Sequence, residues 1–345
     1  MKFYKLTIVI LVIFFKTGNL LSDNNLFIVN NILLEKKENT SNNQLANEAI
    51  KLAFNKLSKR VLLQDDVLKV QGLNLEEIKE LVKYYNISKS LKNNKDNINF
   101  NVTFDKEKIH NLFYKKNILY SDISDKEFFI LPIFLDKNNV FVFSNNFFYK
   151  NWNTIETDDL VEFILPIENI EIIQDINKSK NNLLELKLDI IFQEFSNKNV
   201  GLVLIENDEA VVNKVYMKVR IEDKLISRSL NINKKVENIS VNDEVIIQVK
   251  NEITNLIKSQ NLIDIRTPSF LNAKLNLDKK NNLVILRSKL ENMDLIENIF
   301  VQEFNKDYVD IKIKYLGKLE KIIKQLKTKN IILQLRDDNW IIQTL

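Results

Sequence analysis

The sequence predicts an α+β protein of three small modules, each an antiparallel or mixed sheet with helices on one side. Some segments alternate apolar and polar residues, as strands do, and others repeat apolar residues at helical spacing. The two kinds of segment follow one another along the chain. Hydrophobic residues make up 45% and charged residues 28% of the chain, which is typical of a folded protein. The 345 residues suffice for two or three domains of roughly 100–150 residues each.

The first module is expected over residues 23–117. Thr40, Ser41 and Asn42 can cap a helix whose one face carries small and apolar residues, which suits close packing on a sheet. The expected elements are a strand over 26–38, this helix with Leu45, Ala49, Ala53, Leu57 and Val61 inward, a helix over 75–85, a hairpin of 86–91 and 98–104 around a turn at 93–97, and a helix capped by Asp105.

The second module is expected over residues 125–260. Pro132 lacks an amide hydrogen, so it suggests an edge strand or a strand end. The expected elements are strands over 128–135 and 140–143, helices over 167–176 and 182–195, strands over 200–205 and 210–221, and a long helix over 241–259.

The third module is expected over residues 270–345. Two helices alternate with short strands, which is typical of a ferredoxin-like or related split βαβ unit. Short linkers near 117–125 and 260–270 separate the modules. The expected elements are a strand over 272–286, a helix over 291–300, a strand over 307–315, a helix over 318–327 after Gly317, and strands over 331–335 and 340–344.

The first 22 residues have the features of a signal peptide. Lys2 and Lys5 precede the apolar run Leu6–Phe15, which is shorter than the about 20 residues of a membrane-spanning helix. Ser22 is a small residue suited to cleavage, whereas Leu20 is a poor match to the usual site. The alternatives are an uncleaved inner-membrane anchor and a buried strand. Cleaved export and the anchor both place the remainder of the chain in a bacterial periplasm.

Composition argues against several classes of function. The net charge of +4 is small and dispersed, so a nucleic-acid partner is not expected. The chain has no Cys, which excludes disulfides, thiolate metal sites, a Cys nucleophile and a lipid-bearing Cys after the signal. With four Gly and no phosphate-binding glycine loop, a nucleotide enzyme is also not expected.

No catalytic, metal or cofactor site is predicted. His110 is the only histidine, and its helix face is otherwise polar, so a surface position is favoured over a catalytic role. The pairs Asp65-Asp66, Asp158-Asp159 and Asp337-Asp338 lack the spacing of a calcium loop, and neighbours in sequence rarely face one pocket. We therefore expect solvated loops, with the last pair in a hairpin turn.

The most specific local feature is the aromatic segment Phe147–Trp152. Phe147, Phe148, Tyr149 and Trp152 fall within six residues outside the predicted strands. One interpretation is a lid that closes the core of the second module. The other is a partner-binding surface, because Trp and Tyr side chains often dominate the energetics of protein interfaces.

The order of features resembles the exported bacterial proteins grouped as domain of unknown function 2066, in their alphaproteobacterial form. The residues that carry the resemblance are the helix Leu45–Leu63, the segments Ile98–Asp105 and Phe129–Ile133, Asn151-Trp152, Tyr315-Leu316-Gly317 and Asn339-Trp340. It spans nearly the whole chain after the signal, and it implies an exported protein without an assigned activity.

Residues 131–259 are similar in element order to the N-terminal domain of the periplasmic protein TolB, and to flagellar-assembly and penicillin-binding-protein-activator lipoproteins. This resemblance implies an adaptor that binds another envelope protein and is not an enzyme. The lipid-anchoring Cys of the lipoproteins is missing. The alternatives are an envelope hydrolase or carbohydrate-binding module that uses scattered carboxylates, and a membrane-anchored periplasmic protein with an intact N-terminal helix.

Overall fold

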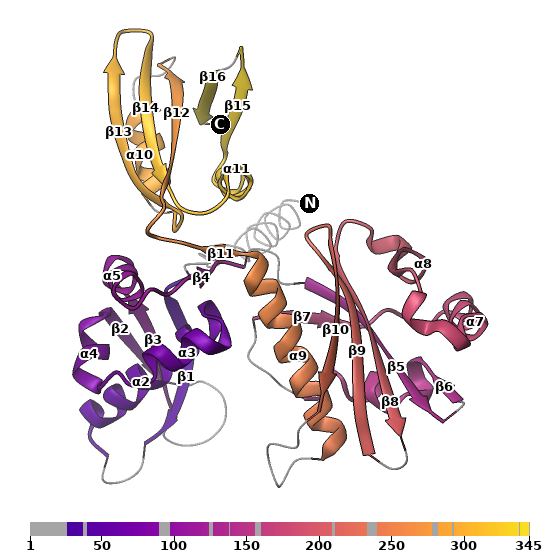
Figure 1. Cartoon of the computed structure of the whole chain (residues 1–345). Helices are drawn as coiled ribbons and strands as arrows, with labels where there is room; N and C mark the ends of the chain where they lie inside the picture. The colour runs from indigo at the N-terminus through magenta and orange to yellow at the C-terminus, as the bar shows by residue number, and fades with distance from the viewer. Residues whose placement is uncertain are drawn as a thin grey trace, which may run out of the picture. The chain divides into compact units, whose positions relative to one another are not determined.

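The computed structural model confirms the α+β class (Figure 1). It describes residues 26–36, 40–89, 97–123, 127–137, 139–155, 160–208, 211–232, 240–277, 282–291, 293–337 and 339–344. The predicted signal segment, residues 1–22, lies outside the described residues. The chain divides into two compact units, one of residues up to Ala53 with Leu75–Ile109, and one of Phe54–Asn74 with His110–Leu345. The division into three modules stays a prediction.

The sheet of the first unit is antiparallel, in the order β1-β3-β2. The central strand alternates as expected, with Phe100, Val102 and Phe104 buried. The strands are β1 (Ile28–Glu35), β2 (Val82–Lys89) and β3 (Asn97–Phe104).

The helix α2 (Asn42–Val61) begins at a capping box. The Ser41 hydroxyl accepts a hydrogen bond from the Gln44 amide at 3.2 Å, and the Gln44 carboxamide oxygen accepts one from the Ser41 amide at 2.9 Å. The five residues predicted to face inward, Leu45, Ala49, Ala53, Leu57 and Val61, are all buried. The short helix α3 (Gln64–Val70) follows.

The predicted helix over 75–85 is wrong in its second half. The helix α4 (Leu75–Glu80) ends before Val82, where β2 begins. Val82, Tyr84 and Tyr85 are β-branched or aromatic, and the ladder to β3 pairs the backbone groups on the inner edge of the strand. The prediction counted them by helical spacing and so placed Tyr85 inward. Most of the predicted turn at 93–97 lies outside the described residues.

The large sheet of the second unit has the order β10-β9-β8-β5-β6, and β7 also pairs with β5. One face packs against the long helix α9 (Val241–Gln260), and the other against α7 (Ile170–Lys178) and α8 (Leu188–Ile191). The predicted helix over 182–195 is broken into short turns around α8, and β7 and β10 were not predicted. The strands are β5 (Glu127–Asp136), β6 (Asn139–Phe141), β7 (Glu162–Ile164), β8 (Asn199–Asp208), β9 (Val211–Ile221) and β10 (Lys224–Asn231).

Pro132 does not mark an edge or the end of a strand, so that prediction is wrong. It lies in the middle of β5, which pairs with β8 along its length on one side. On the other side β7 pairs with 127–129 and β6 with 134–136, which leaves Pro132 between them. The Pro132 carbonyl accepts a hydrogen bond from the buried Asn146 amide group at 2.8 Å. A missing amide hydrogen costs little at such a gap.

The last sheet has the order β13-β14-β12-β16-β15. The observed order is β-α-β-β-α-β-β, which differs from the expected order β-α-β-α-β-β. The final strand β16 lies between β12 and β15, parallel to β12 and antiparallel to β15. The elements are β12 (Ser269–Asn276), α10 (Asn282–Glu291), β13 (Ile296–Phe304), β14 (Tyr308–Tyr315), α11 (Leu319–Thr328), β15 (Ile331–Arg336) and β16 (Asn339–Thr344).

Two predicted elements of this region are wrong. The expected strand over 272–286 ends at Asn276, and α10 occupies its second half, with Leu286 and Leu290 buried at helical spacing. Most of the expected helix over 291–300 is instead the strand β13, because the backbone there pairs with β14. In short apolar runs the period alone does not separate helix from strand. Among the described residues, no helix is both long and apolar enough to cross a membrane.

Candidate functional site

The aromatic segment forms the short helix α6 (Phe147–Asn151), which follows a 3-10 turn. Asn146 caps it: the side-chain oxygen accepts a hydrogen bond from the Phe148 amide at 2.9 Å. The same side chain donates to the Pro132 carbonyl, so Asn146 joins α6 to the middle of β5, where neither β6 nor β7 pairs with it. The sheet therefore determines where the aromatic side chains point.

These four aromatic residues have different environments. Phe148 and Trp152 are fully buried in the core beneath α9, and the Trp152 ring meets the edge of Phe163 at 6.3 Å between centroids. The Tyr149 hydroxyl donates to the Pro166 carbonyl at 2.7 Å. Phe147 remains 41% exposed. The lid interpretation agrees with this packing, and a partner could contact Phe147 but not the buried rings.

His110 is not a surface residue, contrary to the prediction. It lies on α5 (Lys106–Lys116) and is buried, with Nδ1 3.3 Å from Oε1 of Glu297. The Tyr120 ring packs on its imidazole at 5.3 Å between centroids. The polar helix face predicted exposure, and only the tertiary contacts of His110 reverse that prediction.

The acidic pairs lie far apart from one another in the sequence. Asp65 and Asp66 lie in the first turn of α3 and not in the expected loop, and Asp66 pairs with Lys69 at 2.5 Å. Asp158-Asp159 lies outside the described residues, as does Asp338. Asp337 sits at the turn between β15 and β16 with positive φ, as expected for a hairpin turn. No cluster of three or more acidic, His or Cys side chains able to hold a metal occurs within the described ranges.

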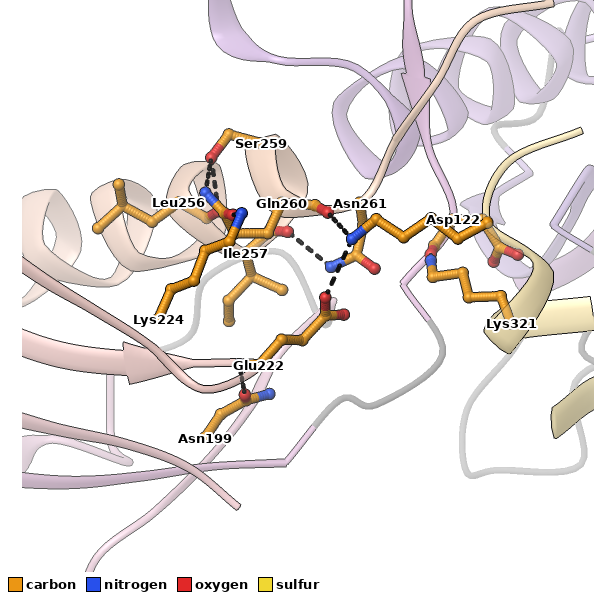
Figure 2. Close-up of polar contacts among 11 residues, drawn as sticks. Asp122, Asn199, Glu222, Lys224, Leu256, Ile257, Ser259, Gln260, Asn261 and Lys321 are labelled. Carbon is orange, nitrogen blue, oxygen red and sulfur yellow. Dashed lines mark hydrogen bonds and ion pairs between the residues drawn. The ribbon is translucent and has the colours of Figure 1, made fainter. Parts of the chain in front are cut away.

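A buried polar cluster surrounds Asp122, next to the small β4 (Tyr120–Ser121) and β11 (Leu262–Ile263) pair. Figure 2 shows the Lys321 side chain reaching the Asp122 backbone, where its ammonium donates to the carbonyl oxygen. The Gln325 amide donates to the Asp122 carboxylate at 3.4 Å. These contacts join α11 to the segment that follows β4.

Burial shifts the pKa values of this cluster. It raises the pKa of Asp122; the Lys321 ammonium opposes the shift, and the Asp294 carboxylate adds to it. Burial also lowers the pKa of Lys321, against the pull of Asp122. Both charged forms are therefore disfavoured by their surroundings.

A second set of contacts lies at the end of α9 (Figure 2). The Asn261 side chain donates to the Ile257 carbonyl at 2.9 Å, which caps the helix. Lys318 donates to the Gln260 carbonyl at 3.3 Å and lies 3.5 Å from the Glu222 carboxylate. Each of these side chains bonds to a backbone carbonyl or an opposite charge within the protein. We therefore assign the contacts at the end of α9 a structural role.

The Asp122 cluster predicts a pH-dependent stability. A carboxyl whose pKa is raised by folding stabilises the folded state below its unfolded value of about 3.9, and that contribution is lost as the pH rises through the folded value. Asp122→Asn imitates the neutral form. We expect this variant to match the parent near pH 4 and to be more stable at pH 7, measured by thermal unfolding across this range.

Asp307→Asn is the matched control, because Asp307 is exposed. It should change stability by less than about 0.5 kcal/mol. A stability of Asp122→Asn below that of the parent at pH 7 would show that the ionised carboxylate is favoured in the folded protein.

The first unit holds a groove of about 540 Å³ between α2 and the edge strand β2. This volume falls within the usual range of ligand sites. Val82–Tyr85 form one wall and Lys79 of α4 contributes to it, and the other wall consists of Asn43, Ala46, Asn47 and Ile50 on α2.

Apolar side chains of β2 remain exposed beside the groove. Tyr85 and Ile87 pair with Val102 and Phe100, so they share the sheet face of those buried residues. They are nevertheless 40% and 51% exposed. The helix side of the sheet is therefore incompletely covered at β2.

The outer edge of β2 is also open. β3 pairs with its inner edge, and within the described ranges no strand pairs with the other. The register slips by one residue between Val82 and Tyr84, a β-bulge that adds Lys83 to the strand beside the groove. Unpaired amides and carbonyls next to apolar side chains make such an edge a template for another strand.

Sequence reasoning missed this site. The predicted hairpin strand began only at residue 86, and Val82–Tyr85, the part of β2 that lines the groove, was assigned to a helix. The run Val82–Ser88, with two Tyr, a Val and an Ile among polar residues, carries the strand signal that could have found it. Its place at an edge depends on which strands pair, and the sequence does not show that pairing.

Comparison of the chain with family models, with curated proteins and with solved structures gives no match.

Proposed function

We propose that this chain is a non-enzymatic interaction protein that binds an extended segment of a partner along β2. The observation that carries the proposal is that no strand of the described ranges pairs with the outer edge of β2, beside the groove to α2. Strand addition of this kind draws affinity from backbone hydrogen bonds and specificity from pockets for alternate side chains.

The proposed cellular setting is the bacterial envelope. The basic and apolar halves of residues 1–15 support export, and the resemblance to domain of unknown function 2066 agrees with it. The partner would then be another envelope protein. Phe147 remains a candidate second contact, since it is the exposed member of the aromatic segment.

Peptide display on the full chain tests the strand-addition proposal. Selected peptides are expected to slow hydrogen exchange at the amides of β2, because a strand added at the open edge would accept hydrogen bonds from those amides that point outward. Ile87→Glu places a charge on the groove side of β2 and should weaken binding by about tenfold or more.

Leu225→Glu is the matched control, because Leu225 is an exposed apolar residue on another edge strand, β10. It should leave binding unchanged. Peptides that protect other segments, or that bind equally well to the Ile87→Glu variant, would overturn the assignment of the site to β2.

A further inference from the structure

The charged residues that line the groove are positive, which favours a negatively charged partner. Two of the groove's lining residues are lysines, Lys79 and Lys83, and none of the lining residues is acidic. Two others, Asn43 and Asn47, offer amide groups on the opposite wall. A strand lying along β2 would pass between these lysines and the polar end of the α2 wall.

Lys83 is the stronger candidate of the two cations. The Lys79 ammonium lies 3.0 Å from Glu76, which partly neutralises its charge. Lys83 is exposed, has no counterpart on β3 because of the bulge, and makes no ion pair within the described ranges. An incoming carboxylate would therefore find its nearest uncompensated cation at Lys83.

We propose that the segment bound along β2 is acidic, with apolar side chains toward Ile50 and Tyr85 and carboxylates toward Lys83 and Lys79. This inference rests on the proposed function. A second copy of the chain is a poorer occupant, because each copy would bring its own Lys83 to the shared edge. An acidic segment instead supplies the opposite charge.

Three synthetic peptides of equal length test the charge preference. They carry alternating Val and Thr, with Glu, Gln or Lys at the same two positions. Binding to the full chain is measured by fluorescence anisotropy at low and at physiological salt. We expect the Glu peptide to bind about tenfold more tightly than the Lys peptide at low salt, with a smaller ratio at higher salt.

Lys83→Glu should invert this preference. Lys56→Glu makes the same change in net charge on an exposed residue of α2 outside the groove, so it should preserve the preference. Equal binding of all three peptides, with protection of the β2 amides, would overturn the acidic partner and leave strand addition standing. No binding by any peptide, or a dimer formed through β2 in sedimentation experiments, would overturn both.

Discussion

Trp152→Ala is expected to destabilise the large sheet of the second unit by about 3–5 kcal/mol, as typically found for fully buried aromatic residues. Trp152 is fully buried among the residues beneath α9, and it contacts the edge of Phe163. Truncation would leave a cavity between α6 and this core. Hydrogen exchange of the β8 and β9 amides measures the effect, because these strands lie at the centre of the sheet.

Two matched variants test whether the loss of stability comes from the buried packing of Trp152. Trp152→Phe keeps a ring and removes an indole nitrogen that is buried without a hydrogen-bond partner among the described residues, so we expect a cost of about 1–2 kcal/mol. Phe147→Ala, at the exposed end of the same helix, should cost less than about 0.5 kcal/mol. Equal losses for Trp152→Ala and Phe147→Ala would contradict the buried position of Trp152.

Lys258→Met is expected to cost about 3 kcal/mol. The Lys258 side chain is buried on α9, and its ammonium donates to the carbonyls of Lys59 and of Leu62, the latter at 3.0 Å. Carbonyls at a helix end lack partners within the helix, and a cation there also interacts favourably with the helix dipole. Methionine keeps an apolar stem of similar length and removes the donors.

The loss should appear as faster hydrogen exchange at the C-terminal turn of α2 and in thermal unfolding. Lys224→Met is the control, because Lys224 is exposed and donates to the Gln260 side chain at 2.9 Å. We expect a change below about 0.5 kcal/mol for it. If both lysine variants have the same small effect, the carbonyls at the end of α2 have other partners in solution.

Helices with a long and regular apolar face were predictable. The face of α2 was found because five small or apolar residues recur at helical spacing after a capping serine, and α9 was found by its length. β3 and β5 were equally clear from alternation and from an apolar run. Local chemistry determines these elements, so the neighbouring chain segments do not change their type.

Short apolar runs were assigned incorrectly where backbone pairing decided the outcome. Residues 82–85 and 296–300 carry apolar side chains at spacings compatible with both a helix and a strand. Each is a strand because its backbone pairs with another strand, β3 or β14. Pairing partners are distant in sequence, which is why periodicity could not choose between helix and strand.

The sequence by itself determined the α+β class, the capped helix α2 and the clustering of four aromatic side chains near residue 150. Only the tertiary structure decided that Trp152 fills a core, that His110 is buried against Glu297, and that β2 lies at an open edge beside a groove. The physical reason is the range of the interactions. Capping and helical spacing involve residues three or four positions apart, whereas burial and strand order depend on segments brought together from distant parts of the chain.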